Sequence, residues 1–419
     1  MSGFNNTSQV LCKTIDARNG SLRVVSDERQ LDAFARLRVS NPFTIFDSKL
    51  TANKAELFYD EDTNGTGGIT YNTGESSVTL DVSANADRAI RQTYMRFNYQ
   101  PGKSQLILLT GVMGDVVADT EARIGYFNTG TSAPYTATRD GLYFGRDGTD
   151  QYVAISNLGV ETKITQSNWN LDKMDGTGKS GITLDFTKTN IMLIDFEWLG
   201  VGRVRFGYVI DGIPVYVHQE LNANTDNTKV YMAVPNHSIR YEIYSTGGTS
   251  ELLQICSSVI SEGGSDPVGL TRGINTGITT QAVSTTKEAL LGYRLTTASL
   301  CTTILNKVIS IINTTKGDFL WELQLNPTYA DTPSWTSGGT SSAIEYAVGS
   351  GANTLSADGE VLATGYGSEL SKIDLDIDSI IHAGVALDGT RDEIWIVVQS
   401  LSGSIDFVAG LNLNELSCG

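Results

Sequence analysis

Two-residue turn signals recur along the chain, and the segments between them alternate apolar with polar residues. Asn-Gly or Asp-Gly begins at eight positions: Asn19, Asn64, Asp140, Asp147, Asp175, Asp211, Asp358 and Asp388. Both dipeptides suit hairpin turns, because Asn, Asp and Gly tolerate the positive φ that these turns require. Many short alternating strands joined in this way are typical of β-sandwiches and barrels. The sequence therefore predicts an all-β chain of antiparallel sheets.

The segment around Asp211-Gly212 shows this pattern most fully. A two-residue turn predicts three cross-strand pairs there: Ile210 with Ile213, Tyr208 with Val215, and Phe206 with Val217. One face of this hairpin is apolar and is expected to face a core, while the face with Arg203 and Arg205 is expected to be solvated. Pro214 lacks an N–H, which places it at a sheet edge or a bulge.

The same reasoning applies at Asp147-Gly148. A two-residue turn there predicts two further pairs: Leu142 with Val153, and Tyr143 with Tyr152.

Breaks in the alternation divide the chain into three parts. The glycine-rich stretch SEGGSDPVGLTRG separates a first β-sandwich, residues 41–264, from a second β-sandwich domain, residues 265–419. Residues 1–40 are polar and carry a net charge of +2, against −9 and −10 for the two domains. We interpret them as an N-terminal attachment arm. The one helix candidate is residues 26–37, with Ser26 as a possible N-cap.

Charge and hydropathy exclude several classes of partner. The formal charge is −17, so the chain has no general attraction to nucleic acid or to anionic membrane. No apolar run is long enough to span a bilayer, and the N-terminus lacks a signal-peptide pattern, so synthesis in a cytoplasm is expected. The four cysteines are scattered: Cys12, Cys256, Cys301 and Cys418. Free or buried thiols are the favoured interpretation, and disulfides stay open.

Motifs for metals and phosphates are incomplete. Residues 175–180 (DGTGKS) resemble the end of a phosphate loop, but Lys173 replaces the first glycine and a strand-like segment follows. Residues 60–65 resemble the start of a calcium loop whose bidentate Glu would fall at Tyr71. The three carboxylates Asp374, Asp376 and Asp378 share one strand face, too far apart for one ion. The three histidines are scattered: His218, His237 and His382. No metal or cofactor site is predicted.

The closest approach to a catalytic pair is Asp195 and Glu197. These two carboxylates share one strand face, as in some β-sandwich glycosidases, but the third carboxylate of the ExDxxE pattern is absent. A structural role is favoured, and no catalytic residue is predicted. The five tryptophans could form sugar platforms, although core packing is favoured because four lie in apolar strand contexts.

Two longer blocks carry a family resemblance. They are residues 32–50, DAFARLRVSNPFTIFDSKL, and residues 167–212, which include DFEWLGVGRVRFGYVIDG, followed by RYEI at 240–243 and QICSSVISEGG at 254–264. The chain resembles a structural (virion) protein family of tailed bacteriophages, with relatives in large DNA viruses. The resemblance covers residues 30–265, and the second domain matches only loosely. The middle block also looks like a concanavalin-type jelly roll, a likeness of fold that argues function weakly.

The resemblance implies a non-enzymatic protein on the exterior of a phage particle, as a decoration, fibre or tail-associated subunit, made in the host cytoplasm. Its implied partners are other virion proteins of the capsid or tail and copies of itself in a homo-oligomer. No cofactor is implied. The alternative is a glycan-binding receptor-recognition protein, or a polysaccharide depolymerase of the virion, with a host surface glycan as partner.

Overall fold

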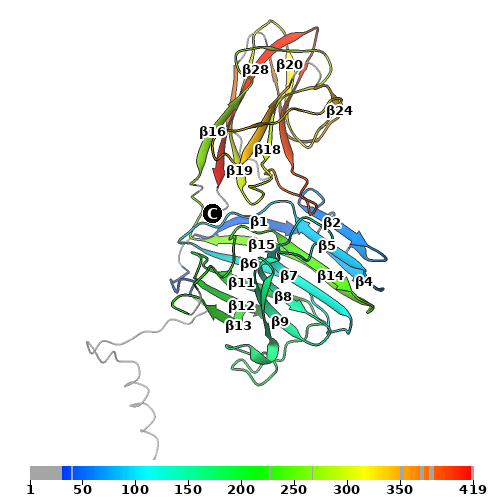
Figure 1. Ribbon diagram of the computed structural model, residues 1–419, viewed down its shortest axis with the longest axis vertical. Coiled ribbons are helices and arrows are strands. Elements are labelled where there is room, and N and C mark those ends of the chain that lie inside the picture. The colour runs from blue at the N-terminus through cyan, green and yellow to red at the C-terminus, as the bar shows by residue number, and fades with distance from the viewer. Residues whose placement is uncertain are drawn as a thin grey trace, which may run out of the picture.

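The protein is all-β, and its strands form two successive domains (Figure 1). The computed structural model describes residues 31–38, 41–225, 228–266, 268–349, 353–368, 372–376 and 382–416. Within these residues every strand pair is antiparallel, and the helical element is one 3-10 turn, η2 (Gln166–Asn168). No described helix has the length and apolar character needed to cross a membrane.

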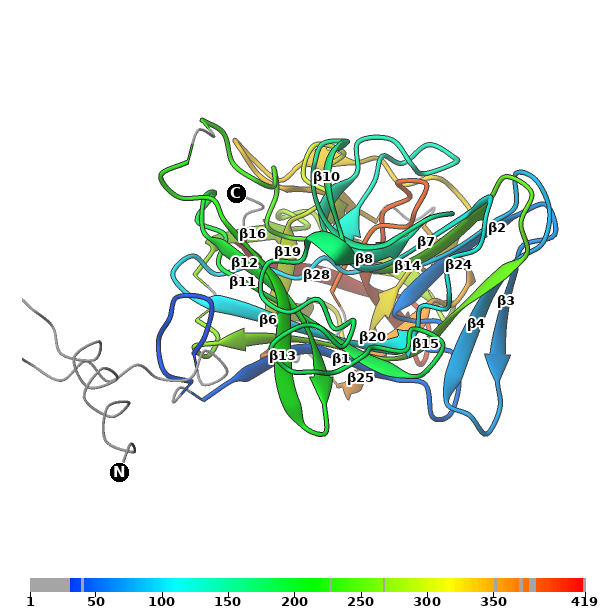
Figure 2. The same cartoon turned by 90° about the horizontal axis from the view of Figure 1, so that it is seen from below.

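The first domain is a sandwich of two large sheets, which Figure 2 shows as separate layers. The eight-stranded sheet has the order β13 (Ile213–Leu221), β12 (Arg203–Ile210), β11 (Asn190–Phe196), β6 (Ser104–Val112), β15 (Ser250–Glu262), β4 (Ser77–Val82) and β3 (Gly68–Asn72), with β1 (Phe43–Lys49) pairing with β15. The seven-stranded sheet has the order β10 (Val160–Thr165), β9 (Gln151–Asn157), β8 (Asp140–Arg146), β7 (Thr120–Asn128), β14 (Ile239–Ser245), β5 (Arg88–Thr93) and β2 (Tyr59–Asn64).

The second domain packs a five-stranded sheet against a six-stranded one. The five-stranded sheet has the order β16 (Leu270–Asn275), β28 (Ile405–Leu416), β19 (Thr303–Asn313) and β26 (Lys372–Asp376), with β17 (Gln281–Val283) pairing with β28. The six-stranded sheet has the order β22 (Thr336–Ser337), β23 (Ile344–Val348), β18 (Glu288–Leu295), β27 (Glu393–Ser400), β20 (Phe319–Leu325) and β25 (Glu360–Gly367). A small ribbon pairs β21 (Thr328–Tyr329) with β24 (Leu355–Ala357).

Each sandwich encloses its own apolar core. In the first, alternate residues of facing strands, such as Leu109 and Tyr241, are fully buried between the sheets. In the second, Phe319 and Phe407 stack edge to face with ring centroids 4.8 Å apart. Period-two alternation produces these cores because successive side chains of a strand point to opposite faces.

Several hydrogen bonds join the two domains. The N–H of Val385 donates to the carbonyl of Tyr94 at 2.9 Å, and the N–H of Leu387 donates to Asp60 at 2.7 Å. The hydroxyl of Thr303 donates to the carbonyl of Arg96 at 3.0 Å. The second domain therefore rests on the end of the first sandwich that carries β1, β2 and β5 (Figure 1).

The hairpin at Asp211-Gly212 confirms the predicted turn but not the whole register. Both turn residues have positive φ, 51° and 76°, and Pro214 lies on β13, an edge strand, as predicted. The predicted pair of Phe206 with Val217 is wrong, because a β-bulge shifts the register and Phe206 pairs with His218. A bulge places two residues of one strand opposite one residue of its partner, so the alternation within one strand does not predict it.

The predicted solvated face of this hairpin is also wrong. Arg205 is fully buried there, because residues 31–38 cover the outer face of the eight-stranded sheet. Its guanidinium donates to the carbonyl of Leu31 at 2.9 Å, while Arg203 donates to Asp32 and Ala33 carbonyls.

The hairpin at Asp147-Gly148 has a longer loop than predicted. Leu142 pairs with Ile155 and Tyr143 with Ala154, two residues away from the predicted partners. The Asp147 carboxylate accepts the N–H groups of Thr149 and Asp150, each at 3.0 Å, which closes a four-residue loop in place of a two-residue turn.

The helix predicted for residues 26–37 is not formed in its described part. Leu31 and Leu37 form an antiparallel bridge. The Asp32 carboxylate accepts both the N–H and the Nε of Arg36 at 2.8 Å, so a local side-chain turn replaces helical hydrogen bonds. Residues 26–30, and most of the expected arm at 1–40, lie outside the described residues.

Candidate functional site

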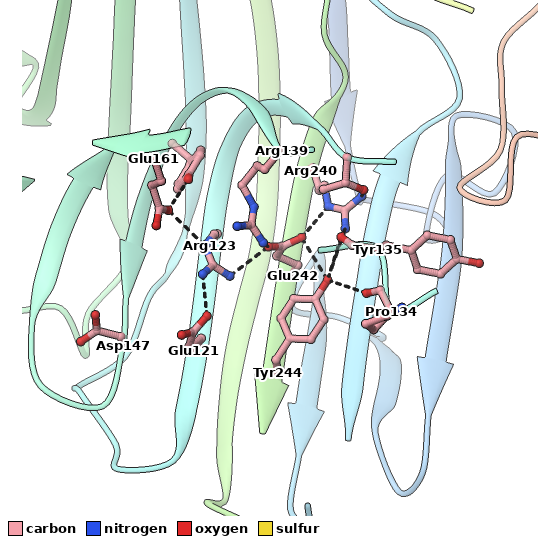
Figure 3. Close-up of polar contacts among 12 residues, drawn as sticks. Glu121, Arg123, Pro134, Tyr135, Arg139, Asp147, Glu161, Arg240, Glu242 and Tyr244 are labelled. Carbon is pink, nitrogen blue, oxygen red and sulfur yellow. Dashed lines mark hydrogen bonds and ion pairs between the residues drawn. The ribbon is translucent and has the colours of Figure 1, made fainter. Parts of the chain in front are cut away.

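The outer face of the seven-stranded sheet carries charge in place of apolar residues. On β14, Tyr241 and Ile243 point into the sandwich core, so Arg240, Glu242 and Tyr244 lie on the opposite face. On the neighbouring strand β7, Arg123 lies on that face as well. Figure 3 shows these side chains converging above the sheet.

Glu242 is the centre of this cluster. One carboxylate oxygen lies 2.6 Å from Nε of Arg240, and the other lies 3.1 Å from both Arg123 and Arg139. Glu242 and Arg240 are both fully buried. We call these four residues the arginine–glutamate cluster.

The ionic state of Glu242 follows from two opposed effects. Burial alone would raise the pKa of this carboxyl, but the charges of Arg240, Arg139 and Arg123 outweigh it and lower the pKa to about 2. Glu242 is therefore a fixed anion at neutral pH. It cannot supply a proton as a general acid.

The loop between β7 and β8 holds Arg240 in place from above. The guanidinium of Arg240 donates to two residues of this loop, to the carbonyl of Tyr135 at 3.1 Å and to the hydroxyl of Thr129 at 3.2 Å. From β5, Gln92 accepts from the same guanidinium at 2.8 Å. These neutral oxygens accept hydrogen bonds from the N–H groups of Arg240 that do not contact Glu242.

Three carboxylates lie on one side of the arginine–glutamate cluster (Figure 3). Glu121 lies 2.5 Å from Arg123 and has a side chain 47% exposed. Glu161 accepts the hydroxyl of Tyr143, and Lys163 lies 3.7 Å from Glu161 and 3.3 Å from Asp147. We call Glu121, Glu161 and Asp147 the acidic rim.

Beneath the acidic rim lies a small aromatic layer. Phe127 and Tyr143 pack with centroids 4.8 Å apart, and the ammonium of Lys163 lies 4.6 Å above the ring of Tyr152. The Tyr152 hydroxyl is buried with no hydrogen-bond partner among the described residues. Burial raises the pKa of both tyrosines, so they are neutral donors. Phe127, Tyr143 and Tyr152 are all buried, so it is the acidic rim above them that reaches solvent, where its carboxylates can accept hydrogen bonds from a polar ligand.

Asp195 and Glu197 lie in the other sheet and do not form a cleft. Asp195 is fully buried on the outer face of β11, where it contacts Arg205, lies 2.6 Å from Arg38 and accepts the hydroxyls of Tyr216 and Ser104. Glu197 follows β11 and accepts the N–H of Arg203 at 3.0 Å. The structural interpretation of this pair is thus supported by its contacts.

The other motif residues occupy structural positions. Asp175 accepts the N–H of Thr177 at 2.8 Å in a hairpin loop, and Asp62 pairs with Arg88 inside the sheet. In the described part of the chain, no three His, Cys, Asp or Glu side chains are placed to hold a metal ion. The side chains of Asp374, Asp376 and Asp378 lie outside the described residues.

Tryptophans and cysteines of the described residues also occupy structural positions. Three tryptophans are buried as expected: Trp169, Trp321 and Trp395. Cys256 is a free thiol, as favoured, whereas Cys301 is disulfide-bonded, contrary to the favoured interpretation of free thiols. Cys12 and Cys418 lie outside the described residues.

Sequence reasoning missed the arginine–glutamate cluster. Its members come from three segments, and only Arg240 and Glu242 are close in sequence. One signal was present: in RYEI, both charges fall in an otherwise apolar strand, two residues apart and on one face. A solvated strand face would give the same sequence pattern as a buried ion cluster. Only the residues on neighbouring strands distinguish the two.

Comparisons with known proteins give weak likenesses of fold. No protein-family model matches the chain, and no curated protein matches it in sequence. Among solved structures, the carbohydrate recognition domain of Emp47p is 10% identical with a TM-score of 0.33, covering 54% of this chain and 99% of that one. A lectin from Bauhinia forficata in complex with GalNAc is 13% identical with a TM-score of 0.31, covering 53% and 97%. Rv0315 of Mycobacterium tuberculosis, a pseudo β-1,3-glucanase, is 10% identical with a TM-score of 0.35, covering 52% and 98%. Likenesses this weak assign neither ligand nor activity to this chain.

Proposed function

We propose that the first sandwich is a non-enzymatic glycan-binding domain, and that sugar hydroxyls bind at the acidic rim. The observation that carries this proposal is the attachment of Glu121 to the buried Arg123. A carboxylate held in this way keeps its free oxygen in a fixed position, which reduces the entropy cost of binding. Sugar hydroxyls can donate hydrogen bonds to such an oxygen.

The pairing of Glu242 and Asp195 with arginines is the reason for proposing binding rather than cleavage. Glycoside hydrolysis needs one carboxyl that is protonated and a second that is ionised. The central Glu242 is held ionised by three arginines. In the other sheet, Asp195 is buried between Arg38 and Arg205. Release of reducing ends from host polysaccharide by the purified chain would contradict this part of the proposal.

A glycan array probed with the full chain tests the binding proposal. We expect a reproducible saccharide signal that Glu121→Gln reduces at least tenfold. The matched control is Glu251→Gln, an exposed glutamate on β15 in the opposite sheet, which should leave the signal unchanged. An array without signal, or equal signals from both variants, would contradict the proposal.

The virion role is a second proposal, and one contact supports it. The two blocks that resemble phage structural proteins, residues 32–50 and 167–212, meet where Arg38 lies 2.6 Å from Asp195. The residues that carry this resemblance therefore contribute to one ion cluster in the first sandwich. On this proposal the chain is displayed on the particle exterior beside capsid or tail proteins and copies of itself.

Imaging of purified particles with an antibody against this chain tests the virion role. Regular labelling of the head or tail is expected. Particles that carry no label, although the antibody recognises the free chain, would contradict it.

A further inference from the structure

A cavity lies between the two domains, away from the acidic rim. Its volume is about 720 Å³, within the range of roughly 300–1,000 Å³ typical of small-molecule sites. The first domain contributes Phe43, Ile45 and Phe58 to its wall, and the second domain contributes Leu300 and Leu305. The wall is thus largely apolar, and Phe43 is 49% exposed.

A single guanidinium interrupts this apolar wall. Tyr94, Arg96 and Asn98 line the cavity from a segment between β5 and β6. Arg96 donates to the carbonyl of Leu300 across the domain boundary, and Nε lies 2.9 Å from the Asn128 side-chain oxygen in the orientation that satisfies both ends of that amide. Both partners are neutral.

Arg96 has no anionic partner among the residues that the structure describes. No described carboxylate forms an ion pair with Arg96, and burial lowers the pKa of its guanidinium to about 10, which keeps it charged at neutral pH. Arg205 and Arg240, which are fully buried on the first sandwich, each pair with a carboxylate, whereas the equally buried Arg146 is satisfied by neutral oxygens. Unlike Arg146, Arg96 lines a cavity, so a bound anion can reach its guanidinium and offset the cost of desolvation.

The other charged or titratable groups at the cavity do not change this balance. Asp47 pairs with Lys49 at 3.2 Å, and both side chains are more than half exposed. Lys307 is exposed on the second domain, and His382 lines the wall beside Ala383. Neither of these adds negative charge near Arg96.

We propose that this interdomain cavity binds an amphipathic anion, with a carboxylate head paired to Arg96 and an aliphatic chain packed against Phe43, Leu300 and Leu305. Charge-assisted hydrogen bonds to a guanidinium are about twice as strong as neutral ones, and the apolar wall contributes burial of the chain. Because both domains line the cavity, the ligand also joins them.

Calorimetric titration of the full chain with decanoate tests this proposal. We expect decanoate to bind at least tenfold more tightly than decan-1-ol, which has the same chain without the charge. Arg96→Met should weaken decanoate binding at least tenfold and leave decanol binding unchanged, while Arg96→Lys retains part of the affinity. Arg36→Met is the matched control, because Arg36 is exposed and pairs with Asp32 away from the cavity. It should bind as the wild type does.

Three outcomes would overturn the proposal. They are absence of decanoate binding to the wild-type chain, equal affinity for decanoate and decanol, and unchanged affinity in Arg96→Met. The comparison of the two wild-type titrations needs no variant, so it decides the matter even if Arg96→Met fails to fold. Loss of glycan binding in Glu121→Gln has no bearing on this cavity, since the two sites share no residue.

Discussion

Arg38 and Asp195 are separated by 157 residues, yet the guanidinium of Arg38 lies 2.6 Å from the carboxylate of Asp195. The same carboxylate contacts Arg205, which is fully buried. This contact ties the segment before the first strand to the outer face of the eight-stranded sheet. It converts a strand face that alternation alone marks as solvated into a second buried layer.

Removal of the Asp195 charge should destabilise the first domain strongly. Asp195→Asn removes the carboxylate that Arg38 and Arg205 share, although Arg38 keeps Glu262 at 2.7 Å. Breaking a buried pair in this way costs roughly 3–5 kcal/mol. Urea denaturation measures the change. Asp47→Asn is the matched control, because that exposed pair should contribute less than about 1 kcal/mol. Similar losses in both variants would contradict the interpretation of the Arg38–Asp195 contact.

The arginine–glutamate cluster should make stability depend on acid pH. The pKa of Glu242 falls from 4.5 to about 2 on folding, so its contribution is fully present above pH 4.5 and is lost as the pH falls through 2. We expect the stability difference between wild type and Glu242→Gln to shrink over that window by on the order of 3 kcal/mol. Denaturation midpoints at a series of pH values measure it. A difference that does not vary with pH would show that Glu242 is not held ionised.

Substitution of Gly212 should destabilise the protein, because the turn at Asp211-Gly212 requires a positive φ at this residue. Gly212 has φ of 76° with open space around an added Cβ, so any cost arises from conformation rather than from a clash. Gly212→Ala should cost about 1–2 kcal/mol, the penalty of a left-handed residue. Gly410→Ala is the control, since an added Cβ there meets atoms only at ordinary contact distances. Thermal melts of both variants give the comparison, and an unchanged melting temperature for Gly212→Ala would contradict the turn.

Attachment through the N-terminal arm stays a prediction. Deletion of residues 2–20 should leave the melting temperature unchanged, because the described contacts of this end begin at Leu31. If the arm anchors the protein, the truncated chain should no longer join particles. Full occupancy of particles by the truncated chain would place attachment in the folded domains.

Local chemistry in the sequence determined the fold class and the turn at Asp211-Gly212. Positive φ at Asp211 and Gly212, the edge position of Pro214 and the apolar alternation each depend on a residue and its nearest neighbours. Such features can be predicted because the steric and hydrogen-bonding limits of one strand act within a few residues.

Only the tertiary structure decided the register at Phe206 and which charges are buried together. A bulge depends on the partner strand, and Glu242 meets Arg123 and Arg139 only after β7, β8 and β14 are assembled. Alternation marks a charged face but cannot say whether water or another segment covers it. The sequence by itself thus determined the strand character of the chain and the turn at Asp211-Gly212. Long-range burial decided the ion clusters, because the free energy of a charge depends on everything that surrounds it.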